Sequence, residues 1–140
     1  MQKLVVVDSS VIVKWLNQQD EDLLEQVDKL MQDAQDMHVI LIAPELAKYE
    51  IGNALLLRKK LSMNEAEVTF NNLFAFPIQF LIQSESLASR TYKIALETNI
   101  TYYDASFIAL AQEEDAILVT DNLKHQGKYS KIKVISLKDY

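Results

Sequence analysis

The chain of 140 residues contains no cysteine, and it has only two glycines and two prolines. The absence of cysteine excludes a disulfide framework and a thiolate metal site, and it fits a protein of the reducing cytoplasm. The scarcity of glycine and proline argues against long linkers and against a turn-dense all-β fold. No apolar run approaches the roughly 18 residues of a membrane span, so we expect a cytoplasmic protein that does not enter a membrane.

Positive charge is also scarce. The 14 Lys and Arg residues face 20 Asp and Glu residues, which gives a formal net charge of -6. Proteins that bind nucleic acid mainly through its phosphates are usually basic, so that class is disfavoured unless metal ions neutralise the acids locally. The hydrophobic fraction of 49% is ordinary for a globular protein, and the length predicts a single domain over residues 1–140.

Five short β-rich runs alternate with longer helical stretches. The runs barely mix apolar with polar residues, as expected for strands covered on both faces. They occupy residues 4–7, 39–42, 77–82, 117–119 and 133–135. The alternation predicts βαβ units, and therefore an α/β fold with a central parallel sheet of about five strands.

The helical stretches carry recognisable start signals. Pro44 suits the first turn of one helix, and Ser62 with Glu65 predicts a capping box at the start of the next. The expected helices cover residues 11–16, 20–35, 44–60, 62–74, 84–98 and 104–113.

Four acids occur where a packed α/β domain least tolerates charge. Asp8 follows the first apolar run directly, and Asp121 follows the run that ends at residue 120. Asp104 opens one helical segment, and Glu50 interrupts the apolar stripe of another. If the two runs are neighbouring parallel strands, Asp8 and Asp121 emerge at the same carboxyl edge of the sheet, where open α/β sheets place their sites.

Glu50 is the acid that is hardest to explain by structure alone. It shares one helical face with Ala47, Ile51 and Ala54. A carboxylate that faces inwards is costly unless it is paired, protonated or bound to a metal. Asn53 lies three residues on, close enough to bind the same ligand or to orient the acid.

Asp8 and Asp104 each have a structural alternative. An aspartate after a strand commonly caps the next helix, a role that is open also to Ser9 and Ser10. Asp104 likewise fits a simple N-cap before the apolar residues 105–111.

The four acids together are stronger evidence for a metal site than any one of them alone. At about 5 Å and an effective dielectric constant near 20, each pair of like charges costs roughly 3 kcal/mol. Converging acids therefore raise one another's pKa values or recruit a cation. The ligand atoms of these acids are all oxygens, which favours Mg²⁺ or Mn²⁺. His38 and His125 offer no zinc-binding set.

The segments that carry the four acids resemble those of the PIN-domain ribonucleases, in particular the VapC-like toxins of type II toxin–antitoxin systems. The resemblance spans essentially the whole chain and lies in four motifs that occur in the family's order. They are Val7-Asp8-Ser9-Ser10, Pro44-Glu45 followed by Glu50-Ile51-Gly52-Asn53-Ala54-Leu55, Tyr103-Asp104-Ala105-Ser106, and Leu118-Val119-Thr120-Asp121-Asn122.

The resemblance implies a three-layer α/β/α fold and a Mg²⁺- or Mn²⁺-dependent endoribonuclease that hydrolyses RNA phosphodiester bonds. It places Asp8, Glu50 and Asp104 among the catalytic, metal-binding acids. It also implies a cognate antitoxin as the protein partner. The apolar and aromatic residues between positions 55 and 76 exceed what one core face needs, and this excess predicts a homodimer.

The fourth acid stays open. Many relatives place it two residues after the threonine, where this chain has Asn122, whereas Asp121 directly follows Thr120. Asp121 can substitute as a catalytic ligand, Asn122 can ligate through its amide oxygen, or three acids can suffice. The hydroxyls of Ser10 and Thr120 are expected to position the acids or the substrate.

Two other acid-bearing α/β folds fit poorly. A receiver domain needs an acid pair after the first strand, and a dehalogenase-like phosphatase needs an aspartate at position 10, which is Ser10. The alternative that remains is a PIN-like module that binds RNA or protein with little or no catalysis.

Overall fold

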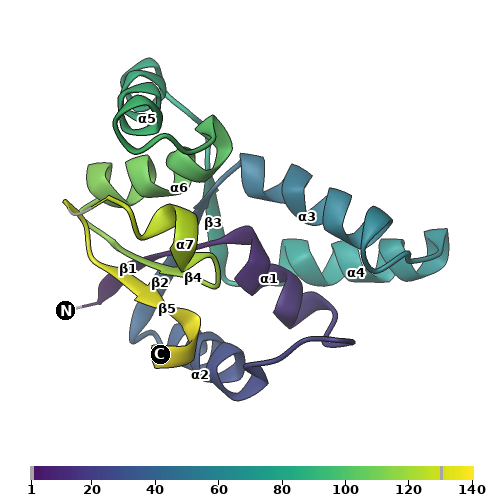
Figure 1. Cartoon of the computed structure of the whole chain (residues 1–140). Coiled ribbons are helices and arrows are strands. Elements are labelled where there is room, and N and C mark those ends of the chain that lie inside the picture. The colour runs from purple at the N-terminus through teal and green to yellow at the C-terminus, as the bar shows by residue number, and fades with distance from the viewer. Residues whose placement is uncertain (1, 130) are drawn as a thin grey trace.

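The computed structural model describes residues 2–129 and 131–140, and a five-stranded sheet forms its centre (Figure 1). The strands are β1 (Lys3–Val7), β2 (Val39–Pro44), β3 (Ile78–Leu81), β4 (Ile117–Thr120) and β5 (Val134–Ser136). Their order is β3-β2-β1-β4-β5, and every neighbouring pair is parallel. The predicted parallel sheet is confirmed, and its central strand is β1, which Asp8 follows directly.

Helices cover both faces of this sheet. They are α1 (Ser9–Leu16), α2 (Leu24–Gln35), α3 (Leu46–Leu57), α4 (Met63–Ala75), α5 (Glu85–Thr98), α6 (Tyr102–Glu113), α7 (Leu123–Gln126) and the 3₁₀ turn η1 (Leu137–Asp139). Figure 1 shows α6 on one face with α5 outside it, α2 on the other face, and α3 with α4 extending to one side. The arrangement confirms the three-layer α/β/α expectation.

The core explains why the strands lack polar alternation. Val5, Val6 and Val7 are at most 2% exposed because β1 lies between two helical layers. Helix α6 is buried along residues 105–111, since it packs against the sheet on one side and against α5 on the other. None of the helices in the described part of the chain is long and apolar enough to cross a membrane.

Several element boundaries differ from the prediction. Pro44 ends β2 instead of opening a helix, and α3 stops at Leu57 instead of residue 60. The second helix begins at Leu24 instead of residue 20, because Asp20 and Leu23 both adopt positive φ. The short helix α7 was not predicted, and its four residues are too few to show a helical period.

Candidate active site at the carboxyl edge of the sheet

Asp8 lies at the centre of the candidate site. Its side chain follows the buried end of β1, and the residue is only 7% exposed. The Asp8 Oδ2 atom accepts hydrogen bonds from Ser10 Oγ at 2.7 Å and from Thr120 Oγ1 at 3.1 Å. Asp8 occupies the N-cap position of α1, yet its carboxylate makes no capping hydrogen bond. The helix-cap alternative therefore does not explain the carboxylate.

Glu50 approaches the same region from α3. The residue is half-buried, and its Oε1 atom accepts a hydrogen bond from Ser9 Oγ at 2.7 Å. Because Ser9 directly follows Asp8, this bond ties α3 to the start of α1 and brings the two acids towards each other. Asn53 is exposed on α3, and no hydrogen bond joins it to Glu50 among the described residues.

Asp104 is the third residue of α6 and is half-buried. The cap of this helix is Thr101, whose Oγ1 atom accepts a hydrogen bond from the Asp104 backbone N–H at 3.0 Å. The expectation that the helix starts at Asp104 is therefore wrong, and the alternative role of Asp104 as an N-cap falls with it. The Asp104 carboxylate therefore does not cap this helix.

Burial and mutual repulsion act on two of the three acids. Burial raises the pKa of Asp8, and the negative charge of Asp104 raises it further, against the lowering effect of the Ser10 and Thr120 hydroxyls. Burial also raises the pKa of Glu50, and the charges of Asp8 and Asp104 add to that effect. Among the ion pairs of residues 2–129 and 131–140, none involves these three carboxylates.

Asp121 turns towards a different neighbour. It is exposed, and its Oδ2 atom lies 3.4 Å from the Nζ atom of Lys14. The next residue, Asn122, donates its backbone N–H to Thr120 Oγ1 at 2.8 Å. The turn after β4 thus holds the Thr120 hydroxyl against Asp8, while Asp121 pairs with a cation.

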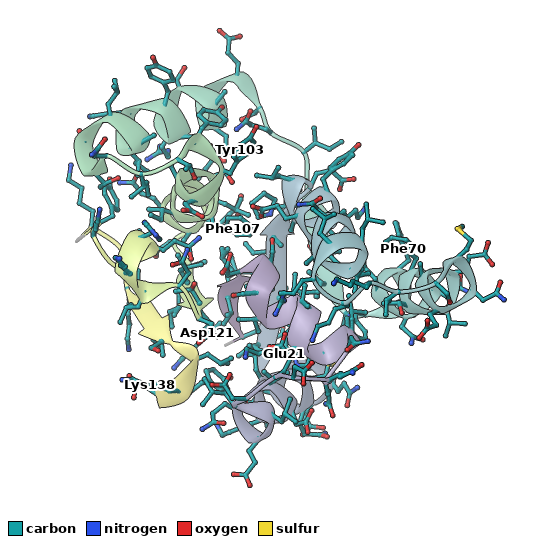
Figure 2. The ribbon with its side chains drawn as sticks, turned by 45° about the vertical axis from the view of Figure 1, so that its right-hand side comes forward. Glu21, Phe70, Tyr103, Phe107, Asp121 and Lys138 are labelled. Atoms are coloured by element: carbon teal, nitrogen blue, oxygen red, sulfur yellow. The ribbon has the colours of Figure 1, made fainter. Side chains whose placement is uncertain are left out.

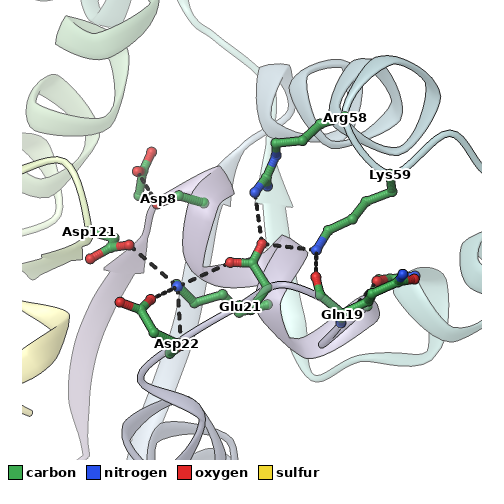
Figure 3. Close-up of polar contacts among 10 residues, drawn as sticks. Asp8, Gln19, Glu21, Asp22, Arg58, Lys59 and Asp121 are labelled. Atoms are coloured by element: carbon green, nitrogen blue, oxygen red, sulfur yellow. Dashed lines mark hydrogen bonds and ion pairs between the residues drawn. The ribbon is translucent and has the colours of Figure 1, made fainter.

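Sequence reasoning missed a cluster of opposite charges around Lys14 (Figure 3). Lys14 is only 2% exposed, and its Nζ atom contacts Asp22 at 2.7 Å and Glu21 at 3.2 Å. Glu21 also pairs with Arg58 at 2.8 Å and with Lys59 at 3.1 Å. The available signal was a lysine inside the apolar stretch of residues 11–16, since a buried ammonium needs acidic partners.

The donor set of Asp8, Glu50 and Asp104 suits a hard divalent cation, because all of its ligand atoms are oxygens. As they stand, no three His, Cys, Asp or Glu side chains in the described ranges are grouped closely enough to enclose an ion. Mg²⁺ usually keeps several waters and uses one or two carboxylates directly. The donor chemistry of these acids therefore suits an ion that keeps several of its waters.

Comparison with known proteins agrees with this geometry. Ribonuclease VapC3 of Pyrobaculum aerophilum is 29% identical over 122 residues, which cover 84% of this chain and 88% of that protein. Among solved structures, VapBC2 from Rickettsia felis, bound to a DNA fragment from its promoter, matches with a TM-score of 0.71 at 15% identity. That match covers 95% of this chain and 98% of the Rickettsia chain.

A second solved structure supports the same fold. A toxin–antitoxin complex from Klebsiella pneumoniae matches with a TM-score of 0.70 at 12% identity, and it covers 97% of this chain and 99% of that chain. The family profile of the PIN domain matches residues 5–130. The four acid-bearing motifs, the parallel sheet that presents them and this match agree, and the chain belongs to the PIN-domain family.

Proposed function

We propose that this protein is a divalent-metal-dependent endoribonuclease that hydrolyses RNA phosphodiester bonds. The observation that supports the proposal is that Asp8 and Glu50 have raised pKa values, mainly through burial and further through the charge of Asp104. Acids that repel one another without a paired cation are the arrangement that a metal ion relieves. The ribonuclease named among the relatives supports the choice of RNA as substrate.

The three acids have different roles in the proposed reaction. Asp8 and Asp104 would be the principal metal ligands, and Glu50 would hold the ion directly or through water and would help to orient the attacking water. A bound Mg²⁺ or Mn²⁺ supplies positive charge that favours ionised water and stabilises charge on the phosphate and the leaving oxygen. The hydroxyls of Ser10 and Thr120 hold the Asp8 carboxylate in place through their hydrogen bonds.

The fourth position of the proposed site lies at Asp121 or Asn122. Asp121 pairs with Lys14 at 3.4 Å, so it already has a cationic partner, which it shares with Glu21 and Asp22. We therefore favour a site of three acids, with Asp121 as a metal ligand only if it leaves Lys14. Asn122 contributes through its backbone, which orients Thr120.

We further propose that the ribonuclease is the toxin of a type II toxin–antitoxin pair. Two structural neighbours are described as VapBC2 and as a toxin–antitoxin complex, which supports an antitoxin as the partner. An antitoxin that presents Arg or Lys to Asp8, Glu50 and Asp104 would neutralise them and block the metal site. Such a contact would inhibit the enzyme by the same electrostatics that recruit the metal.

The test of the function is cleavage of structured RNA with Mn²⁺ and with chelator. The variants Asp8→Asn and Asp104→Asn should each lose activity, because asparagine keeps the side-chain shape but removes the ligand charge. Asp28→Asn is the matched control, since Asp28 is exposed on α2 and should leave activity unchanged. Full activity of Asp8→Asn in nuclease-free protein would refute the site. No cleavage by the wild type under any metal would favour the alternative of a non-catalytic interaction module.

A further inference from the structure

A cavity of about 180 Å³ lies at the carboxyl ends of β2 and β3 and has no part in the chemistry described so far. Its walls come from the ends of β2 and β3 and from the starts of α3, α5 and α6. The lining residues are Pro44, Glu45, Leu46, Leu81, Gln83, Leu87, Tyr102, Tyr103 and Ser106. We propose that this cavity binds one base of the RNA substrate next to the scissile phosphate, an inference that rests on the proposed function.

The position of the cavity follows from the strand order. Pro44 and Leu81 end β2 and β3, whereas Asp8 and Thr120 mark the ends of β1 and β4. Neighbouring strands lie about 4.8 Å apart, so the cavity lies one to two strands along the same sheet edge from Asp8. A nucleotide whose phosphate is at the acids can reach that distance with its base.

The same helices carry the acids and the cavity walls. Tyr103 lines the cavity and directly precedes Asp104 at the start of α6. Leu46 lines it from α3 and lies four residues before Glu50, which places both side chains on one helical face. The mouth of the cavity is therefore within one helical turn of two of the three acids.

The chemistry of the walls suits a flat ring with polar edges. Leucine and proline side chains form the floor, and Leu87 is only 4% exposed. Tyr103 is 59% exposed at the start of α6, where Figure 2 labels it, and its ring is available for stacking. Single-stranded RNA is commonly recognised by stacking of bases on aromatic side chains.

Polar groups at the rim can read the edge of a base. The Tyr102 hydroxyl donates a hydrogen bond to Gln83 Oε1 at 3.2 Å, which holds the Gln83 amide at the cavity. An amide both donates and accepts, as the edge of a base requires. Pockets for drug-sized molecules measure about 300–1,000 Å³, so this smaller cavity suits one ring system, not a whole nucleotide.

Direct binding tests the cavity apart from catalysis. The probes are the four nucleoside 5′-monophosphates, titrated in chelator into protein with labelled leucine methyl groups and followed by NMR. At least one nucleotide should shift the methyl signals of Leu46, Leu81 and Leu87. Tyr103→Ala should weaken that binding roughly tenfold, as expected when a stacking partner of a base is removed, whereas Tyr103→Phe should retain it.

Cleavage kinetics supply the second readout. Tyr103→Ala should raise KM for RNA and relax the base preference beside the cut, with little change in kcat and an unchanged thermal shift by Mn²⁺. Tyr92→Ala is the matched control, because Tyr92 is 62% exposed on α5 and does not line the cavity.

The outcomes separate the two proposals. Nucleotide binding without RNA cleavage would refute the ribonuclease and the role of the cavity beside a scissile phosphate, and would leave only a nucleotide-binding cavity. Cleavage with an unchanged KM and base preference in Tyr103→Ala would refute the cavity and keep the ribonuclease. Methyl shifts with N-acetyl-leucinamide but with no nucleotide at millimolar concentration would assign the cavity to a protein side chain and overturn the inference.

Discussion

Asp8 is the residue whose charge is most at odds with its surroundings. Burial and the charge of Asp104 raise its pKa, while two hydroxyl groups partly offset that rise. A carboxyl whose pKa is higher in the folded than in the unfolded state favours folding when it is protonated. This contribution is fully present below the unfolded pKa and is lost as the pH rises through the folded pKa.

The first prediction follows from the raised pKa of Asp8. In chelator, Asp8→Asn should be at least as stable as the wild type at pH 8, because it removes a buried charge that repels Glu50 and Asp104. The advantage should shrink as the pH falls towards 4, because the wild-type carboxyl, whose pKa is raised by burial, takes up its proton on the way. Urea unfolding across this pH range measures the difference. A variant that is less stable than the wild type at pH 8 and equal to it at pH 4 would contradict the prediction.

Metal binding should relieve the same repulsion. A ligand at about 100 times its Kd stabilises the folded state by roughly 2.7 kcal/mol, so Mn²⁺ or Mg²⁺ should raise the Tm by several degrees. Asp104→Asn should lose most of this increase and yet melt no lower than the wild type in EDTA. Melting both proteins in EDTA and in Mn²⁺ checks the prediction. A full metal response in Asp104→Asn would remove Asp104 from the ligand set.

At the scale of single elements, local sequence and tertiary contacts share control of the helix ends. Ser62 and Glu65 form the predicted capping box, with both reciprocal hydrogen bonds in place. Ser84 caps α5 by accepting a hydrogen bond from the backbone N–H of Leu87 at 3.1 Å. Such caps depend only on residues within one turn, which is why the sequence predicts them well.

Helix α3 contains a glycine whose small size is not required by its neighbours. A Cβ atom added to Gly52 would lie 3.9 Å from the Phe70 ring, which is ordinary van der Waals contact. Glycine in a helix costs about 1 kcal/mol relative to alanine. Gly52→Ala should therefore increase the free energy of unfolding by about 0.5–1 kcal/mol, as measured by urea denaturation. The matched control Ala54→Gly should decrease it, and a decrease for Gly52→Ala would mean that α4 packs closer than the structure indicates.

At the scale of the whole molecule, α3 and α4 form an arm that extends from the sheet (Figure 1). One face of this arm is buried through Leu55 and Leu73. Large apolar side chains remain exposed on it, namely Leu56, Leu57, Met63, Val68 and Phe74. Exposed apolar side chains commonly mark a protein interface where they adjoin one another.

We predict that the protein forms a homodimer through this arm. Light scattering at micromolar concentration should give twice the monomer mass, and a charge in the interface, as in Val68→Glu, should shift the protein towards monomer. Leu96→Glu is the matched control, because Leu96 is 70% exposed on α5, away from the arm. A monomeric wild type at these concentrations would contradict the prediction.

The sequence by itself determined the sheet, the order of the acid-bearing motifs and the family. The sequence predicts these features because strands that are buried on both faces must be apolar. An acid directly after such an apolar run therefore stands out as a candidate site residue. Burial is the main cause of the raised pKa values of Asp8 and Glu50, and the charge of Asp104 adds to both.

Only the tertiary structure decided how the charges are paired. Lys14 and Asp121 lie 107 positions apart in the numbering of the sequence, and the 3.4 Å contact between them exists because β1 and β4 are neighbours in the sheet. The bond from Ser9 to Glu50 likewise depends on how α3 packs against α1. Long-range ion pairs and hydrogen bonds have no local period, so residue spacing predicts which acids share an edge but not which of them pairs with a lysine.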